Sequence, residues 1–393
     1  MASTLPIARV GGVDIRAHWS LLVVVALLVW SLTDGVFPET NPGLSDGSYL
    51  AMALVAAFLF LLSILLHELG HAVQAGREGV PVGGITLWVF GGIAEMPGDM
   101  PSPGAEFRIA AAGPAVSLVL GVVCVGVALA LPLPSEIDGV LFWCGQINLS
   151  LLVFNLIPAL PLDGGRMLRA ALWARRHDLL SATRTAGALG RGFGQLLIAG
   201  GLALAIFGGD FSGVWFVFIG WFVLAAAEAE LGGTSARAAL AGLTVEDLMV
   251  RTPVTTPASV SVQGFMDQVF LATRHTAYPV LEAGEVVGLV SFRQALDLPP
   301  GRWGTTPVRE IMTPLPEVTV AATAPLTEVL PRLTSGNLRR LLVVHDLEFV
   351  GLLSETDVMR VLEVRTRVAS AATERRRPQP TAARPLSSSR WAR

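Results

Sequence analysis

Long apolar runs constrain the fold of this chain more than any other feature of its sequence. A helix needs about 17–25 mostly apolar residues to cross a bilayer. The N-terminal part of the chain offers six such candidates: Trp19–Leu32, Tyr49–Ala75, Phe107–Leu131, Val140–Leu160, Phe193–Gly208 and Gly213–Ala229. Only 15% of the 393 residues are charged, against about 25% in a typical soluble protein. We therefore predict a polytopic α-helical membrane protein with about six transmembrane helices.

The arginines predict how these helices cross the membrane, because basic residues concentrate in cytoplasmic loops. Arginines precede the first run, separate the second from the third and the fourth from the fifth, and follow the sixth. The other connections carry acidic residues and no arginine. We therefore expect a multi-pass protein of the cytoplasmic membrane, with its N- and C-termini on the cytoplasmic side. The net charge of −3 gives no indication of nucleic-acid binding.

The C-terminal part of the chain contains an internal duplication. Residues 243–300 and 305–364 repeat the order strand, helix, strand, strand, helix, and Gly288–Ser291 in the first copy matches Gly351–Ser354 in the second. A duplication of this size predicts two similar α/β units. Residues 366–393 are rich in Arg, Ser, Pro and Ala without apolar periodicity, so we expect a disordered tail.

The second apolar run contains "HELGH", in which two histidines flank a glutamate. Residues four apart share one face of a helix, so His67 and His71 can bind one zinc ion while Glu68 acts as general base on the metal-bound water. The alternative is a pair of histidines that pack between helices. Ionisable residues inside a membrane are functional candidates by default, which favours the metal site.

Asp163 is the predicted third ligand, since a catalytic zinc takes three protein ligands and keeps one position open. The second and fourth apolar runs cross in the same direction, which puts Asp163 at about the depth of the histidines and on the same side. Pro158 and Pro161 would end the helix before it, and Gly164 and Gly165 would give the backbone freedom to aim the carboxylate inward. Asp163 could also serve as the N-cap of the following helix.

The pairing of "HELGH" with "FNLIPALPLDGGR" resembles the site-2 protease family of intramembrane zinc metalloproteases, over residues 1–235. The resemblance implies that His67, His71 and Asp163 bind one Zn²⁺ per chain and that Glu68 activates the water. It also implies cleavage of a transmembrane helix of another protein within the lipid bilayer, near the cytoplasmic face. In bacteria the usual substrates of this family are anti-sigma factors that another protease has already shortened.

Four further residues are candidates for binding the substrate or the transition state. Asn148 and Asn155 fit positions where the family has asparagines, although interhelical hydrogen bonds explain them equally well. Gly91 and Gly92 lie in the apolar, β-prone segment 83–99, which is too short and broken to span a membrane. In the resembled family this segment is a re-entrant β-loop, to which an unwound substrate could add a strand. A cytoplasmic β-hairpin is the alternative.

The stretch "AAAGPAVSL", residues 110–118, is rich in small residues. Small residues let membrane helices approach each other closely. We therefore predict helix packing at this stretch and no catalytic role.

Both C-terminal copies resemble cystathionine-β-synthase (CBS) domains, which pair into one module and often bind adenine nucleotides. The second copy has Ser354 and Asp357, the hydroxyl and carboxylate that such sites use for phosphate and ribose. The first copy has Gln294 where the family often has Asp, which weakens one of the two possible sites. We expect the module to sense a nucleotide that adjusts protease activity, and a homodimer formed through the CBS domains is a further expectation.

The alternative function, from another class, is a CBS-regulated transporter or channel with a structural or transport metal site. Transport does not require a glutamate beside the first histidine, nor a further ligand at the matching depth. Glu68 and Asp163 therefore favour an endopeptidase.

Overall fold

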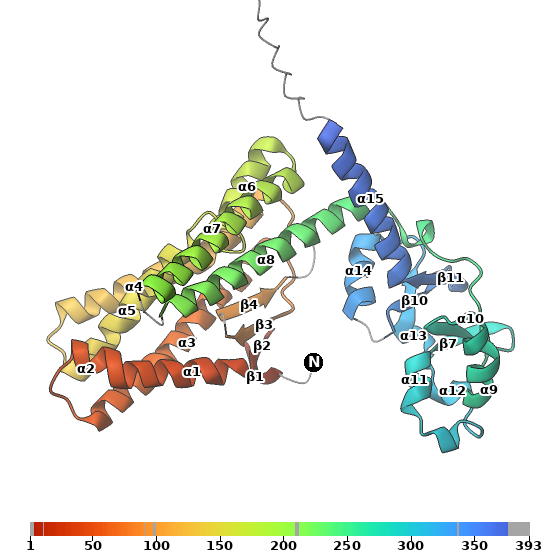
Figure 1. The fold of residues 1–393 in the computed structure, drawn as a ribbon, viewed down its shortest axis with the longest axis horizontal. Helices are drawn as coiled ribbons and strands as arrows, with labels where there is room; N and C mark the ends of the chain where they lie inside the picture. Colours follow the sequence, from red (N-terminus) through yellow and green to blue (C-terminus); the bar gives the residue numbers. More distant parts are fainter. Residues whose placement is uncertain are drawn as a thin grey trace, which may run out of the picture. The chain divides into compact units, whose positions relative to one another are not determined.

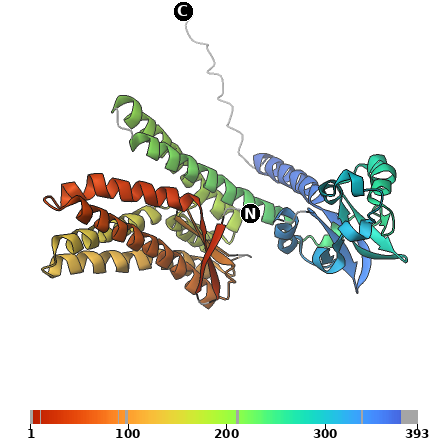
Figure 2. The ribbon, with the colours of Figure 1, turned by 90° about the horizontal axis from the view of Figure 1, so that it is seen from below.

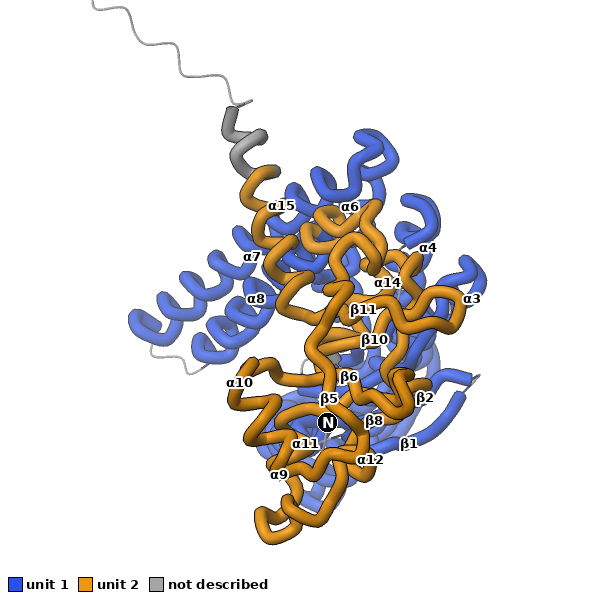
Figure 3. The backbone as a smooth tube through the Cα atoms, turned by 90° about the vertical axis from the view of Figure 1, so that its right-hand side faces the viewer, with its two compact units in different colours: residues 1–234 blue, residues 235–393 orange. Residues whose placement is uncertain are grey.

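The computed structural model describes residues 4–10, 12–89, 91–96, 100–208, 212–335 and 338–375. The chain divides into two compact units, residues 1–234 and residues 235–393, which Figure 3 shows in different colours.

Six helical segments of the described chain are long and apolar enough to cross a membrane, which confirms the predicted number. They are Ser20–Thr40 (which joins α1, Ser20–Ser31, to η1, Leu32–Val36, and α2, Phe37–Thr40), α3 (Asp46–Arg77), α4 (Pro103–Ala130), α5 (Ser135–Asn155), α7 (Leu179–Phe207) and α8 (Ser212–Leu240). The fifth begins at Leu179 rather than Phe193, and the fourth ends at Asn155 rather than Leu160. Figures 1 and 2 show α1, α3, α4 and α5 side by side and α7 beside α8, and α4 packs against α3, α5 and α6 (Asp163–Arg176).

Local signals in the sequence explain where the two central helices begin. The Ser45 hydroxyl accepts a hydrogen bond from the Ser48 amide at the start of α3 (3.2 Å), and the Ser102 hydroxyl accepts one from the Ala105 amide at the start of α4 (3.1 Å). Each hydroxyl satisfies one of the amide groups that a helix N-terminus leaves without an intrahelical partner.

A four-stranded sheet lies beside α3 in the first unit, in the order β1-β2-β3-β4. Its strands are β1 (Thr4–Val10), β2 (Val13–His18), β3 (Gly84–Trp88) and β4 (Gly91–Glu95). The segment 83–99 therefore forms a hairpin, and its parallel partner is β2, with Ile15 opposite Ile85. Ile85 and Leu87 pack against Ala72 of α3, which fixes the hairpin next to the "HELGH" turns. Residue 90 and residues 97–99 of that segment lie outside the described residues.

No strands were predicted before the first apolar run, so β1 and β2 are additions to the expected fold. The signal for β2 is the alternation of Val13, Ile15 and Ala17 with polar residues, which is typical of a half-buried strand. Gly12 precedes it with φ of +88°, a turn conformation that glycine adopts without strain.

The second unit contains the two similar copies, each built on its own sheet. The first sheet has the order β5-β6-β7-β8 and the second β11-β10-β9. The strands are β5 (Thr256–Pro257), β6 (Ala277–Glu282), β7 (Glu285–Ser291), β8 (Thr313–Pro314), β9 (Thr319–Ala321), β10 (Arg340–His345) and β11 (Glu348–Ser354). The main helical segments are η3 (Phe265–Phe270), α11 (Phe292–Asp297), α14 (Leu326–Ser335) and α15 (Glu355–Arg375).

Each copy contributes a leading segment to the sheet of the other. The segment β8 opens the second copy yet pairs with β7 of the first, and Val250, which precedes the first sheet, exchanges two backbone hydrogen bonds with Leu352 of β11 (2.8 and 2.9 Å). Two matching glycines, Gly288 and Gly351, let these leading segments approach the sheets closely. A Cβ on Gly288 would lie 2.5 Å from the Thr313 carbonyl oxygen, and one on Gly351 2.8 Å from the Val250 carbonyl oxygen.

The two copies share one buried apolar cluster, made of Ala277, Leu289, Val318, Leu342 and Leu352. Because residues of both copies form it, the duplicated halves pair into a single module, as expected. The helix α15 continues to Arg375, so residues 366–375 are helical rather than disordered. The rest of the expected tail lies outside the described residues.

Candidate metal centre

The structure brings the three predicted ligands together. His67 and His71 lie one turn apart on α3, and Asp163 is the first residue of α6. Oδ2 of Asp163 lies 3.2 Å from Nε2 of His67 and 3.4 Å from Nε2 of His71, and the two Nε2 atoms lie 3.2 Å apart. All three side chains are buried, so the cluster is shielded from bulk solvent.

These separations fit a tetrahedral zinc site. Zinc lies about 2.0–2.1 Å from its nitrogen and oxygen ligands, which places two ligand atoms of a tetrahedron about 3.3–3.4 Å apart. The observed separations of 3.2, 3.2 and 3.4 Å match this value. The donor set of two imidazoles and one carboxylate leaves a fourth position for a reacting group.

Hydrogen bonds from α4 set the orientation of both imidazoles. Nδ1 of His71 lies 2.7 Å from the Ile109 carbonyl oxygen, and Nδ1 of His67 lies 2.9 Å from the Ser117 hydroxyl. A carbonyl oxygen only accepts, so neutral His71 carries its hydrogen on Nδ1 and keeps a lone pair on Nε2 for a metal. Such partners fix the tautomer of metal-binding histidines.

Gly113 has no side chain and therefore leaves room beside the two imidazoles. A Cβ at this position of α4 would lie 2.3 Å from Nε2 of His71 and 2.5 Å from Nε2 of His67. The interpretation of residues 110–118 as helix packing alone is therefore incomplete, because Gly113 and Ser117 both contact the candidate ligands. The signal in the sequence is the four-residue spacing of Ile109, Gly113 and Ser117, which places them along one face of the helix.

Close packing against the end of α5 holds the start of α6 in place. A Cβ on Gly164 would lie 2.3 Å from the Leu156 carbonyl oxygen, and one on Gly165 2.3 Å from the Ala159 carbonyl carbon. Both glycines have helical φ values, so they serve close approach rather than the backbone freedom that we expected.

The capping role considered for Asp163 is wrong. Leu162 occupies the N-cap position of α6 without a side-chain capping bond, and Asp163 is the first helical residue. A carboxylate there still benefits from the positive end of the helix dipole. Its oxygen is directed at the histidines instead of the α6 amides.

The hairpin β3–β4 contacts Glu68. A Cβ on Gly92 would lie 2.3 Å from Cγ of Glu68 and 3.1 Å from its Oε1, so β4 rests directly on this side chain. Gly91 has φ of +123°, which only glycine adopts readily. Its added Cβ would meet nothing within 4 Å among the described residues. Gly92 therefore contacts the site, whereas Gly91 shapes the turn.

The two asparagines of α5 differ in their surroundings. Asn148 is 1% exposed and donates to the Ser63 hydroxyl (3.0 Å) and the Cys144 carbonyl (2.8 Å). Ser63 lies one helical turn before His67, so Asn148 is close to the metal centre. Its Oδ1 is buried without a hydrogen-bond partner in the described part of the chain. Asn155 is the partly buried last residue of α5, and no hydrogen bond between described residues links it to the ligands.

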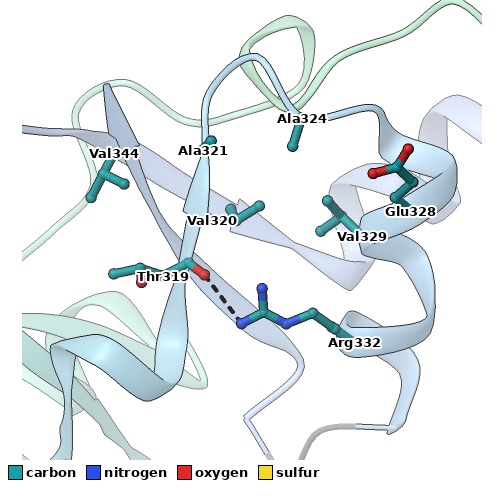
Figure 4. A pocket seen from close by; sticks show the side chains of 8 residues that line it. All are labelled: Thr319, Val320, Ala321, Ala324, Glu328, Val329, Arg332 and Val344. Carbon is teal, nitrogen blue, oxygen red and sulfur yellow. Dashed lines mark hydrogen bonds between the residues drawn. The ribbon is translucent and has the colours of Figure 1, made fainter. Parts of the chain in front are cut away.

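Ser354 and Asp357 form the N-terminal cap of α15. The Ser354 hydroxyl donates to Asp357 Oδ2 (2.5 Å) and accepts from the Asp357 amide (3.2 Å). A cavity of about 390 Å³ in the same copy lies elsewhere, between β9 and α14, where Arg332 donates to the Thr319 carbonyl oxygen (3.1 Å; Figure 4). Neither Ser354 nor Asp357 lines this cavity.

Comparisons with known proteins match both parts of the chain. A sequence model of peptidase family M50 matches residues 55–137 and 132–199, and the CBS domain matches residues 245–301 and 308–364. The "Putative zinc metalloprotease Rip3" of Mycobacterium tuberculosis is 40% identical over 370 residues, which are 93% of this chain and 94% of the relative.

A second relative is the zinc metalloprotease MJ0392 of Methanocaldococcus jannaschii, 28% identical over 93% of this chain and 97% of its own. The solved structure of a site-2 protease from the same organism is 29% identical and covers 58% of this chain and 95% of that chain, with a TM-score of 0.43. The 40% identity to the first relative, over nearly its full length, shows that this chain belongs to peptidase family M50, as a site-2 protease-type zinc metalloprotease with two C-terminal CBS domains.

Proposed function

We propose that this protein is an intramembrane endopeptidase that cleaves transmembrane segments of membrane-anchored regulatory proteins. The observation that carries the proposal is the position of the metal centre. Three buried ligand atoms converge at a helix, α3, that is long and apolar enough to cross a membrane. A hydrolytic site in such a helix can act on peptide bonds that soluble proteases do not reach.

His67, His71 and Asp163 hold the zinc ion in this proposal. When bound, zinc supplies Lewis-acid polarisation of the scissile carbonyl and of a water molecule. Glu68 acts as the general base: its carboxylate takes a proton from the attacking water and later delivers one to the leaving amine. The water oxygen first bonds to the scissile carbonyl carbon, and the peptide C–N bond breaks afterwards, when the amine nitrogen takes the proton that Glu68 delivers. The contact with Gly92 supports this role, because it restricts where the Glu68 side chain can lie.

The edge strand β4 is the proposed docking site for the unwound substrate. Peptide bonds inside a transmembrane helix are occupied by their own hydrogen bonds, so the substrate must unwind before attack. Among the described strands, β4 pairs with β3 alone, which leaves an edge to which an extended peptide can add a strand. Because Gly92 touches Glu68, a strand added there would pass close to the general base.

Asn148 is the proposed polar contact for the substrate backbone on α5. Its buried Oδ1 lacks a partner among the described residues, and a buried acceptor left unpaired is costly. A peptide N–H that enters the site would satisfy this atom. For Asn155, the assignment to substrate binding stays a prediction.

We also propose that the CBS pair binds an adenine nucleotide that modulates the protease. Ser354 and Asp357 support this, together with Arg340, which stands directly opposite Ser354 in the β10–β11 pairing. Arg340 donates to the Ala277 carbonyl of the first copy (3.3 Å), so it lies where the copies meet. Burial lowers the pKa of its guanidinium and the neighbouring Asp357 carboxylate opposes this effect. A phosphate would partner that half-buried cation.

The nucleotide proposal is tested by titrating the purified full-length protein with ATP, ADP and AMP in a calorimeter. Saturable heat that is lost in Ser354→Ala and Asp357→Ala supports it. Absence of heat with all three nucleotides leaves the module a structural or dimerising role.

We also propose that the protein forms a homodimer through its CBS domains. The proposed topology places both termini in the cytoplasm. The arginine distribution supports the topology, because every arginine outside the apolar runs then lies on the cytoplasmic side. Cysteine-labelling of each loop in intact cells would test it directly.

The proteolytic function is tested in the native host by replacing Glu68 with Gln. The expected result is the accumulation of one or a few membrane-anchored proteins that are shortened when wild-type Glu68 is present. Unchanged abundance and length of all membrane proteins, with the variant expressed at the normal level, would contradict the proposal.

A further inference from the structure

Two buried charged residues and one partly buried one join three helices near the metal centre, and the Glu230 side chain is the partly buried one, at 29% exposed. Arg169 of α6 is 7% exposed and Glu106 of α4 is 2% exposed. Nε and Nη2 of Arg169 each lie 2.5 Å from Oε1 of Glu106, and Nη1 lies 2.5 Å from Oε1 of Glu230 on α8. We call these three residues the Arg169 cluster. None of them is a candidate metal ligand.

The face of α4 that carries Glu106 also orients the histidines. Ile109, Gly113 and Ser117 follow Glu106 at intervals of three and four residues, which keeps all four positions on one side of the helix. The Ile109 carbonyl and the Ser117 hydroxyl bind the imidazoles, and Gly113 lies against their Nε2 atoms. Any shift of α4 along its axis therefore moves the two imidazoles.

The helix α6 connects the Arg169 cluster to the metal site, because its first residue, Asp163, is the third candidate ligand. Asp163 and Arg169 belong to the same helix of 14 residues, which behaves as a rigid element over this length. The Arg169–Glu106 contact therefore fixes the start of α6 relative to α4. That relation sets the distances from Oδ2 of Asp163 to the two Nε2 atoms.

We propose that Arg169 is a positioning residue for the metal site, which it holds in shape by fixing α6 against α4 through Glu106. A buried ion pair gives little net stability compared with apolar residues of equal volume, but it specifies how elements align. A metal site needs its ligands held within about 0.5 Å, so alignment is what the cluster provides. The inference rests on the proposed zinc site but not on proteolysis.

The test uses the full-length protein in detergent, on a Glu68→Gln background so that no cleavage occurs. The zinc dissociation constant is measured by competition with a chromogenic chelator, and the Co²⁺-substituted protein gives an absorption spectrum that reports ligand geometry. For Glu106→Gln we expect zinc affinity to fall about tenfold or more, as for other groups that orient ligands, with an altered Co²⁺ spectrum.

The matched control is Glu78→Gln, which removes the charge of an ion pair between the end of α3 and Arg108 of α4 (2.7 Å), where the Arg108 side chain is 56% and the Glu78 side chain 15% exposed. We expect its zinc affinity to stay within about twofold of wild type, since a pair whose guanidinium is open to solvent contributes little. A fall equal to that of Glu106→Gln would contradict the positioning role.

A second variant separates positioning from folding. The triple change Glu106→Leu, Arg169→Met and Glu230→Leu removes every charge of the Arg169 cluster, so no member is left buried without a partner. We expect this protein to fold with a Tm close to that of wild type and yet to bind zinc weakly. Wild-type zinc affinity and Co²⁺ spectrum in the triple variant would overturn the inference. Absence of zinc binding in the parent protein would instead overturn the proposed function.

Discussion

Gly113 sets how closely α4 approaches the metal ligands. Because an added Cβ would lie 2.3 and 2.5 Å from the two Nε2 atoms, Gly113→Ala must displace an imidazole or occupy the metal position. We predict that the purified variant binds zinc about tenfold more weakly or worse. Gly126→Ala is the control, because its Cβ meets nothing within 4 Å of the described structure. Equal zinc dissociation constants for Gly113→Ala and Gly126→Ala would contradict this prediction.

Gly92 lies against the Glu68 carboxylate, the proposed general base, and not against the candidate ligands. Gly92→Ala would place its Cβ 2.3 Å from Cγ of Glu68 and force that side chain to move. We predict a fall in kcat of about 10²-fold or more, the contribution expected of a general base, with normal zinc content. Gly83→Ala, whose Cβ contacts begin at 3.6 Å, should cleave at the wild-type rate. Loss of zinc in Gly92→Ala would show that the strand supports the ligands instead.

The sequence allowed prediction of the ligands but not of the residues around them. His67 and His71 share a helix face by spacing, and Asp163 follows from the depth at which its apolar run ends. The contacts of Gly113 and Ser117 could not be predicted, because a stretch of small residues is equally typical of ordinary helix packing. Only the packing of α4 against α3 shows which small residue meets which imidazole.

Among the elements, β2 joins the N-terminal strand β1 to the hairpin β3–β4, because it pairs with both β1 and β3. Ile15 is 2% exposed and stands opposite Ile85, which is fully buried. We predict that Ile15→Ala costs about 2–5 kcal/mol of stability and lowers the Tm of the protein in detergent. Ile7→Ala, at a side chain that is 59% exposed, should leave the Tm unchanged. A similar Tm for both variants would argue against β2 as a structural part of the hairpin.

The strands β1 and β2 were not predicted, because the pairing that stabilises them involves residues distant in the sequence. The alternation around Val13 and Ile15 is short, and the parallel partner β3 lies far along the chain. A strand that depends on a distant partner shows little signal in its own sequence. The six membrane helices, in contrast, are each defined by their own composition.

At the scale of the whole molecule, the CBS pair is predicted to unfold as one unit. Leu342 of the second copy is fully buried in the apolar cluster that it shares with the first copy. Leu342→Ala should cost about 2–5 kcal/mol and lower the unfolding temperature of both copies together, as followed by hydrogen exchange of each sheet. Leu347→Ala, at a side chain that is 95% exposed, is the control. Loss of protection in the second copy alone would contradict a single module.

Membership of peptidase family M50 decides between the two functions that the sequence left open. The chain is a metalloprotease, so the alternative prediction of a CBS-regulated transporter or channel is wrong.

The pairing of the CBS copies was predictable because their landmarks repeat in order. The cavity beside Arg332 was not, because it forms only where β9, β10 and α14 come together in the folded copy.

The most direct test of the account compares purified wild type and Glu68→Gln, reconstituted with a panel of single-span membrane proteins. Zinc content and cleavage products are measured for both. We expect one zinc per chain in both proteins and a cut inside the transmembrane segment by wild type, with the rate reduced about 10²–10⁴-fold in Glu68→Gln. Cleavage by Glu68→Gln at the wild-type rate, or a wild-type protein that binds no zinc, would contradict it.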